Sequence, residues 1–100
     1  MTIIDNVYAL PHLAGILISG VDAEQFLQSQ LSSNVAVLGP NSVQFSSWCA
    51  ASGRVIGLGW LYRKGTDFCW IVANETAEGL VLGLNKYRFR SKVTVTKADP

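Results

Sequence analysis

Residues 42–74 read SVQFSSWCAASGRVIGLGWLYRKGTDFCWIVAN, and this stretch decides the fold that we predict. It contains three strand-like runs, Ser42–Ala50, Arg54–Lys64 and Asp67–Asn74, joined by two short polar connections that each include a glycine. Glycine reaches the positive φ that tight hairpins require. The pattern therefore predicts two consecutive hairpins within an antiparallel sheet.

The middle run carries the most informative pattern. Because side chains alternate along a strand, its residues divide between two faces: Ile56, Leu58, Trp60 and Tyr62 on one, and Val55, Gly57, Gly59 and Leu61 on the other. Two glycines on one face leave a shallow trough, which admits a packed helix, another backbone or a flat ligand ring. A packed helix is the commonest of these arrangements in layered folds.

A strand and a helix precede this block. Leu13–Ser19 is a continuous apolar run of strand length. Asp22, with Gln25 three residues later, predicts a helix N-cap of the capping-box type. We expect the helix to end near residues 32–34 and to bury one stripe of side chains: Ala23, Phe26, Leu27 and Leu31.

A second helix and a last strand follow the block. We expect Asn74 or Thr76 to cap this helix, which buries Ala77, Leu80, Val81 and Leu84. Gly79 and Gly83 each lower helix stability by about 1 kcal/mol relative to alanine, so we expect them to lie in close contact with the sheet. Lys92–Lys97 alternates as a final strand.

The resulting order is β-α-β-β-β-α-β, which belongs to the α+β class. We predict a mostly antiparallel sheet with two helices on one face, loosely ferredoxin-like in arrangement. One hundred residues fit a single domain. Because the last strand-like run reaches the end of the sequence without a closing element, we interpret residues 1–100 as the N-terminal portion of a longer chain.

Charge is unevenly distributed along the sequence. The net charge is +1, which argues against direct nucleic-acid binding. Residues 54–100 nevertheless hold all eight basic residues and four acidic ones, a local balance of +4. The densest group comprises Lys86, Arg88, Arg90 and Lys92. This group suits phosphates or a polycarboxylate, and it equally suits a helix end, where cations complement the helix dipole.

Few side chains suit catalysis or metal binding. His12 is the single histidine, Cys49 and Cys69 lack CxxC partners, and no Walker or dinucleotide-binding glycine loop is present. We therefore predict no catalytic residue and no metal ligand. The sequence has neither a signal-peptide pattern nor an apolar run of about 18–20 residues, which favours a cytoplasmic protein with no membrane partner.

Four segments occur in the order and spacing of a known family. They are ISGVDAEQFLQSQL at residues 18–31, Asn34-Val35, CAASGRV at residues 49–55 and YRFRSKVTV at residues 87–95. This ordered set resembles the YgfZ-type folate-binding proteins, which are relatives of the glycine-cleavage T-protein, a tetrahydrofolate-dependent aminomethyltransferase. The resemblance extends over about residues 7–96.

One departure separates the two branches of this family. The aminomethyltransferases carry an acidic pair after the segment that resembles residues 51–56, and the first acid works at the reactive nitrogen of the folate. Here Gly57-Leu58 follows, and neither residue can accept a proton or stabilise a cation. The YgfZ branch also lacks this acid. The resemblance therefore implies a tetrahydrofolate-binding protein that supports assembly or repair of iron–sulfur clusters, and thereby tRNA modification.

The resemblance also implies a site and partners. Tetrahydrofolate is the expected cofactor, and its pterin would lie in a central opening bordered by the first strand and the middle hairpin. The expected contacts are Leu13, Trp48 and Trp60 for the rings, and Arg88 and Arg90 for a glutamyl tail. Some relatives have an aromatic residue where this chain has Leu13. Iron–sulfur assembly proteins and the remainder of its own chain are the expected protein partners.

Two other interpretations stay open at this point. A working aminomethyltransferase would need its acid from beyond residue 100. An α+β interaction module would bind a protein partner in the apolar trough. The sequence downstream discriminates among them, since the reactive-cysteine loop of the family, which begins Lys-Gly-Cys, favours the first interpretation and an acidic substitute favours the aminomethyltransferase.

Overall fold

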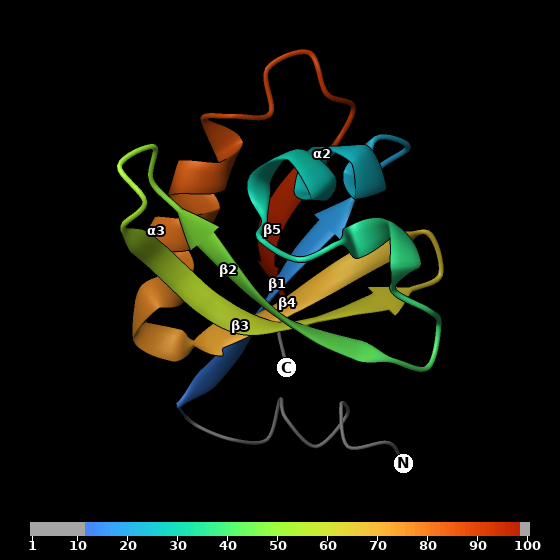
Figure 1. Ribbon diagram of the computed structural model, residues 1–100, viewed down its shortest axis with the longest axis horizontal. Helices are drawn as coiled ribbons and strands as arrows, with labels where there is room; N and C mark the ends of the chain where they lie inside the picture. The colour runs from blue at the N-terminus through green and yellow to red at the C-terminus, as the bar shows by residue number, and fades with distance from the viewer. Residues whose placement is uncertain (1–11, 99–100) are drawn as a thin grey trace.

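Five strands form a single sheet in the computed structural model, which describes residues 12–98 (Figure 1). The strands are β1 (Leu13–Ser19), β2 (Val43–Cys49), β3 (Val55–Lys64), β4 (Asp67–Ala73) and β5 (Thr94–Ala98). The helices are α2 (Ala23–Gln30) and α3 (Asn74–Asn85), with a short 3₁₀ turn, η1 (Val35–Val37), between α2 and β2. The predicted order of elements is confirmed, with strand ends displaced by one or two residues.

The sheet has the strand order β2-β3-β4-β1-β5, and all neighbouring strands are antiparallel. The four strands β3-β4-β1-β5, with α2 and α3 as the two connections on one face, reproduce the ferredoxin-like arrangement. Strand β2 extends this arrangement by pairing with the free edge of β3. The predicted α+β class and antiparallel sheet are therefore confirmed.

Both hairpins form where the glycines predict them. Gly53 and Gly65 adopt φ values of 90° and 63°, which a residue with a side chain rarely adopts. The β2–β3 register runs from Val43 opposite Tyr62 to Cys49 opposite Val55, with a shift between Trp48 and Cys49. The β3–β4 register then places Trp60 opposite Ile71.

The helix caps differ from the prediction. Asp22 occupies the N-cap position of α2, but its Oδ2 accepts a hydrogen bond of 2.8 Å from the backbone amide of Lys92 and caps no amide of its own helix. The N-cap residue of α3 is Ala73, so neither Asn74 nor Thr76 caps that helix. The hydroxyl of Thr76 instead donates to the Ala73 carbonyl at 2.8 Å.

Helix α2 also ends earlier than predicted. Leu31 is already extended and forms a bridge with Trp48 of β2. The amide of Ser32 then donates to the Ser47 carbonyl at 2.9 Å. An edge strand such as β2 leaves alternate backbone groups without partners. The contacts of Leu31 and Ser32 supply partners for some of these groups and so cover part of the outer edge of β2.

The main core lies between the sheet and the two helices. It contains the predicted stripe of α2 in full, while α3 contributes Ala77, Leu80 and Leu84, with Val81 partly buried beside them. The sheet contributes large side chains from its covered face, including Ile16, Ile18, Leu61, Phe68 and Trp70. The two α3 glycines differ: a Cβ at Gly83 would lie 2.7 Å from the Trp48 ring, whereas Gly79 faces open space. The expectation of close contact is wrong for Gly79.

Candidate functional site

The glycine face of β3 is filled by the protein itself. A Cβ built at Gly57 would lie 2.7 Å from a Leu80 methyl group of α3 and 3.1 Å from the Trp70 ring. A Cβ at Gly59 would collide with the Ile71 carbonyl oxygen of the neighbouring strand. Helix α3 at Gly57 and strand β4 at Gly59 therefore fill the trough, and neither a ligand ring nor a partner protein can occupy it.

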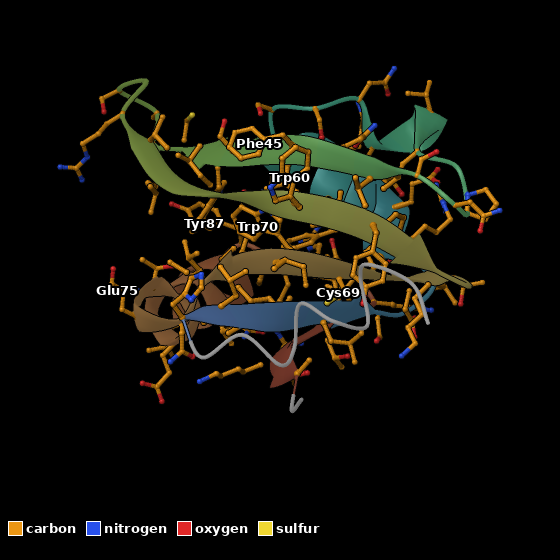
Figure 2. The ribbon with its side chains drawn as sticks, turned by 90° about the horizontal axis from the view of Figure 1, so that it is seen from below. Phe45, Trp60, Cys69, Trp70, Glu75 and Tyr87 are labelled. Carbon is orange, nitrogen blue, oxygen red and sulfur yellow. The ribbon has the colours of Figure 1, made fainter. Side chains whose placement is uncertain are left out.

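The opposite face of β2 and β3 is apolar and accessible. We call it the open face and define it by five side chains, each between 42% and 53% exposed: Val43, Phe45, Ile56, Leu58 and Trp60. Phe45 and Trp60 are cross-strand partners, and their rings meet edge to face with centroids 5.0 Å apart (Figure 2). A contiguous exposed apolar surface of this kind marks a binding site or an interface.

The same face is closed further along the sheet, over β4 and β1. A second cluster of buried side chains there comprises Tyr62, Cys69 and Ile71, with the half-buried Leu13 packed against it. Because Trp60 stands opposite Ile71 in the register, the open face and this cluster are continuous. Two of the predicted ring contacts, Leu13 and Trp60, thus share one face and are separated by strand β4.

Trp48 lies on the other side of the sheet. It is 5% exposed and packs beneath α3 at Gly83, with the Tyr87 ring edge-on at 5.8 Å. Its indole Nε1 donates to the Gln30 side chain at 3.2 Å. Because positions 48 and 57 face each other in the register, Trp48 belongs to the helix-covered face. The structure does not bring Trp48 together with Trp60.

Arg88 and Arg90 lie in the segment between α3 and β5. A guanidinium nitrogen of Arg88 donates to the Val93 carbonyl at 3.3 Å, and the guanidinium of Arg90 lies 5.4 Å from the centre of the Phe89 ring. This segment adjoins the C-terminal end of β1, where Arg88 and Ser19 line a common hollow. Leu13 begins the same strand, about 20 Å away at 3.3 Å per residue. The five predicted contacts therefore do not form one site in residues 12–98.

The hairpin carries no acid in the position that aminomethyl transfer would use. Residues 42–64 contain neither Asp nor Glu. Leu58 is half exposed on the open face, and Gly57 is covered by α3. In the part of the chain that the structure describes, no three His, Cys, Asp or Glu side chains could hold a metal ion together. None of the helices described is long and apolar enough to cross a membrane.

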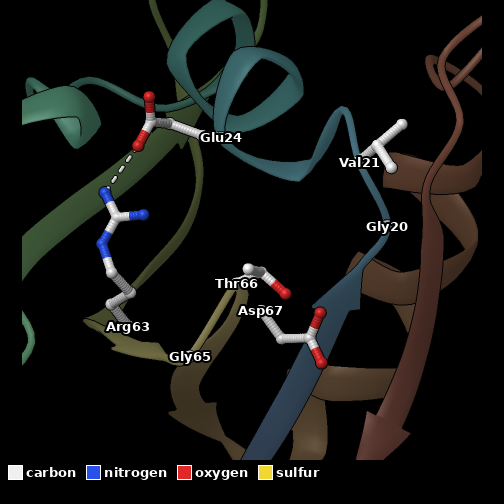
Figure 3. Close-up of a pocket in the computed structure, with 7 residues that line it drawn as sticks. All are labelled: Gly20, Val21, Glu24, Arg63, Gly65, Thr66 and Asp67. Atoms are coloured by element: carbon white, nitrogen blue, oxygen red, sulfur yellow. Dashed lines mark hydrogen bonds and ion pairs between the residues drawn. The ribbon is translucent and has the colours of Figure 1, made fainter.

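The sequence did not predict a pocket at one end of the sheet, which three charged side chains line: Glu24, Arg63 and Asp67 (Figure 3). It has a volume of about 610 Å³ and lies where β1 leads into α2 and β3 turns into β4. Arg63 dominates it: the guanidinium pairs with Glu24 at 2.6 Å, donates to the Leu38 carbonyl at 2.9 Å and stacks 4.6 Å from the centre of the Phe68 ring. These contacts tie α2 and the following loop to the sheet.

A signal for this pocket exists in the sequence. Arg63 follows Gly57, Gly59 and Leu61 at a period of two, so it falls on the covered face. A cation at such a position needs a charged or hydrogen-bonding partner, because burying an unpaired charge is unfavourable. The partner, Glu24, lies 39 residues away and is identified by the structure.

Comparisons with known proteins extend over most of the chain. Over 82 residues it is 33% identical to the tRNA-modifying protein YgfZ of Cronobacter sakazakii and 32% identical to that of an Escherichia coli strain. Each match covers 82% of this chain and 25% of the relative, so the chain spans about a quarter of the length of these curated relatives. No protein-family model matches the chain.

A solved structure supports the same fold. The chain superimposes on the glycine cleavage system aminomethyltransferase T from Bartonella henselae with a TM-score of 0.81 and 20% sequence identity. The superposition covers 88% of this chain and 25% of the aminomethyltransferase. At this identity the likeness establishes the fold alone, and it agrees with the α+β arrangement described above.

Proposed function

Since this chain is a YgfZ-type sequence related to the glycine-cleavage T-protein, we propose that it is part of a cytoplasmic protein that binds tetrahydrofolate. In this proposal the protein supports assembly or repair of iron–sulfur clusters, and thereby tRNA modification. The observation that carries it is the match to YgfZ proteins over 82% of the chain, at up to 33% identity.

The open face is the surface that we assign to the folate rings. Trp60 is 50% exposed and stands beside Phe45, so a flat heteroaromatic ring can stack on or against either side chain. Leu13 lies on the same face across β4 and would border the ligand from the other side. The filled glycine trough supports this assignment indirectly, because it leaves the open face as the apolar surface of the hairpin.

The chemistry of this face supports binding without group transfer. The neighbours of Trp60 on this face include the Ser47 hydroxyl and the Tyr62 phenol but no carboxylate, since residues 42–64 contain neither Asp nor Glu, so the hairpin offers the folate nitrogen no carboxylic acid. Leu58, two residues before Trp60, points to the same face. We therefore propose that this part of the protein holds the folate and leaves its reactive nitrogen unprotonated.

The rest of the site would come from other segments. The relatives are roughly three times as long as this chain, since the 82 matched residues cover 25% of them. We propose that further segments of the complete protein close over the open face, and that iron–sulfur assembly proteins are its partners. Arg88 and Arg90 lie at the far end of β1, so contact with a glutamyl tail would require an extended ligand.

Calorimetric titration of tetrahydrofolate into the protein expressed from its complete gene tests this proposal. We expect saturable binding that Trp60→Ala weakens by at least about tenfold, which corresponds to about 1.4 kcal/mol of lost stacking and apolar contact. Leu82→Ala is the matched control, because Leu82 is 67% exposed on α3 and lies away from the open face. Its affinity should equal that of the unmodified protein.

Two results would contradict the proposal. The first is an absence of heat at high micromolar tetrahydrofolate. The second is an equal loss of tetrahydrofolate affinity in Trp60→Ala and Leu82→Ala, which would show that folate does not bind at the open face. Release of ammonia from an aminomethylated carrier protein in the presence of tetrahydrofolate would instead favour a working aminomethyltransferase.

A further inference from the structure

We propose that residues 86–92, which we call the basic loop, bind single-stranded nucleic acid. This inference is argued from observations other than those that support folate binding, although it involves the two arginines expected at a glutamyl tail, and it departs from the expectation drawn from the net charge of +1. The basic loop reads KYRFRSK, in which cations alternate with two aromatic residues. It connects α3 to β5 and projects beyond the end of the sheet, where Figure 1 draws it in orange to red.

The two aromatic side chains of the basic loop are exposed. Phe89 is 80% exposed and Tyr87 is 59% exposed, although burial is the usual state of such rings. Tyr87 rests edge-on against Trp48, which fixes its ring while leaving much of it accessible. Rings held at a surface in this way offer stacking platforms for nucleobases.

The cations of the basic loop are available to an anion. Lys86, Arg88, Arg90 and Lys92 are all exposed, and none forms a salt bridge within residues 12–98. The carboxylate of Asp22 does reach the loop, but it accepts from the Lys92 backbone amide at 2.8 Å and pairs with no side-chain cation of the loop. Four cations within seven residues therefore create a local positive potential that the net charge of the chain conceals.

The backbone of the loop is held in one shape. The Ser91 amide donates to the Arg88 carbonyl at 2.8 Å, and the Arg88 side chain donates to the Val93 carbonyl. Arg90 adopts a φ of 69°, a left-handed conformation that is unfavourable for a residue with a side chain. This conformation places the Arg90 guanidinium over the Phe89 ring, so a cation and a stacking surface lie side by side.

Two hollows flank Arg88. One, of about 320 Å³, is lined by Phe89 and Arg90 among others, and the second, of about 370 Å³, extends to Gly20 and Thr94. Arg88 and Ser91 contribute to both. Both hollows are shallow and open, so they leave Arg88 accessible from two sides.

The combination favours a single strand over other anions. A polycarboxylate would use the cations but not an 80% exposed phenyl ring. A duplex keeps its bases stacked internally and offers no free base face to Phe89. A single strand presents phosphates to the cations and unstacked bases to the rings, which matches the alternation of the loop.

Fluorescence anisotropy with a labelled oligouridylate of about 12 nucleotides tests the proposal on the protein from its complete gene. We expect binding whose logarithm falls with the logarithm of salt concentration at a slope of about −3, for four phosphate contacts to a single strand. The combined substitutions Arg88→Gln and Arg90→Gln should weaken binding by at least about tenfold and make the slope shallower by about 1.4. Phe89→Leu should weaken binding by about fivefold or more, because a base loses its stacking partner.

Arg54→Gln is the control for the loss of an exposed cation. It removes an exposed cation at the β2–β3 turn, outside the basic loop, and binding should change by less than about twofold. Circular dichroism should be unchanged in all variants, since the substituted side chains are exposed. A deoxyuridylate of the same length identifies the sugar: equal affinity assigns the site to single strands in general, and weaker binding assigns it to RNA.

Three results would overturn the proposal. One is the absence of saturable binding at about 100 µM protein in about 50 mM salt, where even non-specific sites are occupied. Another is an effect of Arg54→Gln as large as that of the double substitution. The last is unchanged binding by Phe89→Leu together with equal competition by poly-glutamate, which would assign the loop to anions of any kind.

Discussion

The two faces of strand β3 are both apolar, yet they serve different purposes. On the face that includes Gly57 and Leu61, helix α3 closes over the strand and side chains are buried. On the face that includes Leu58 and Trp60, side chains remain about half exposed. Residues one position apart therefore differ in their surroundings: side chains of the covered face pack against α3 and stabilise the fold, and side chains of the open face remain accessible.

The difference also shows what composition does not reveal. The open face of β3 carries larger hydrophobic side chains, Ile56, Leu58 and Trp60, than the covered face, so hydropathy alone would assign burial to the wrong face. The two glycines do separate them, because a missing side chain is needed only where another group approaches the strand closely. Leu80 and the Ile71 backbone make that approach.

The same substitution on opposite faces tests this comparison most strongly. Leu80→Ala removes a buried side chain, 3% exposed, that fills the glycine trough, and we expect it to lower the free energy of unfolding by about 2–5 kcal/mol. Leu58→Ala removes a half-exposed side chain, so its effect should be about 1 kcal/mol or less. Urea denaturation of the two variants measures the difference.

Equal losses for the two variants in a protein shortened to this chain would contradict the comparison. Equal losses confined to the complete protein would instead mean that further segments bury Leu58 as thoroughly as α3 buries Leu80. A large loss for Leu58→Ala that disappears in a protein shortened to this chain would identify those segments as the cause.

A second pair of substitutions sharpens the account of the covered face. Gly83→Ala places a methyl group 2.7 Å from the Trp48 ring, so overpacking of about 1–3 kcal/mol should outweigh the gain in helix propensity. Gly79→Ala meets open space in the same helix and should stabilise the protein by about 0.5–1 kcal/mol.

Thermal unfolding of these two variants gives the signs directly. Opposite signs would confirm that α3 touches the sheet at Gly83 and not at Gly79. Stabilisation by both substitutions would show that the Trp48 ring moves aside, and that the contact beneath α3 is looser than the distance indicates.

The smallest effect is expected at the rim of the covered face. Glu24→Gln removes the partner of Arg63 in a salt bridge whose acidic side chain is 48% exposed. Such pairs contribute about 0.2–1 kcal/mol, and salt screens them. Glu78→Gln is the control, because it removes an exposed carboxylate that forms no salt bridge within residues 12–98.

Urea titrations measure the free energy of unfolding of both variants. We expect Glu24→Gln to lower it by an amount that shrinks in concentrated salt, and Glu78→Gln to leave it unchanged. A loss that is independent of salt would point to the hydrogen bond and the packing around Arg63 in place of its charge. Arg63 would then stabilise the covered face through its hydrogen bond to the Leu38 carbonyl and its contact with the Phe68 ring.

Local patterns predicted most of the fold because local chemistry controls it. A few neighbouring residues are enough to predict strand β1, from the apolar run Leu13–Ser19, and the two hairpin turns, from their glycines. The predicted helix caps are not observed, because capping depends on more than the local sequence. The side chain of Asp22 has two possible partners, the first amides of its own helix and the Lys92 amide 70 residues away, and only the packed fold decides between them.

The candidate site was less predictable. Trp48 and Trp60 are both tryptophans in neighbouring strands, and the sequence assigns them similar roles. The strand register places Trp48 opposite Gly57 beneath α3 and Trp60 opposite Ile71 on the open face. Whether each residue contacts folate stays a prediction, but the two tryptophans lie on opposite faces of the sheet and cannot both contact the same pterin ring.

The sequence by itself determined the order of strands and helices, the antiparallel hairpins and the absence of an acid in residues 42–64. These follow from alternation, turn residues and composition, which act over short distances along the chain. Only the tertiary structure decided that Leu80 of α3 fills the glycine trough, that Arg63 pairs with Glu24, and that Phe89 remains exposed among four cations. Those outcomes depend on contacts between residues that are far apart in the chain. Such contacts form, and stabilise the protein, only when the helices pack on the sheet.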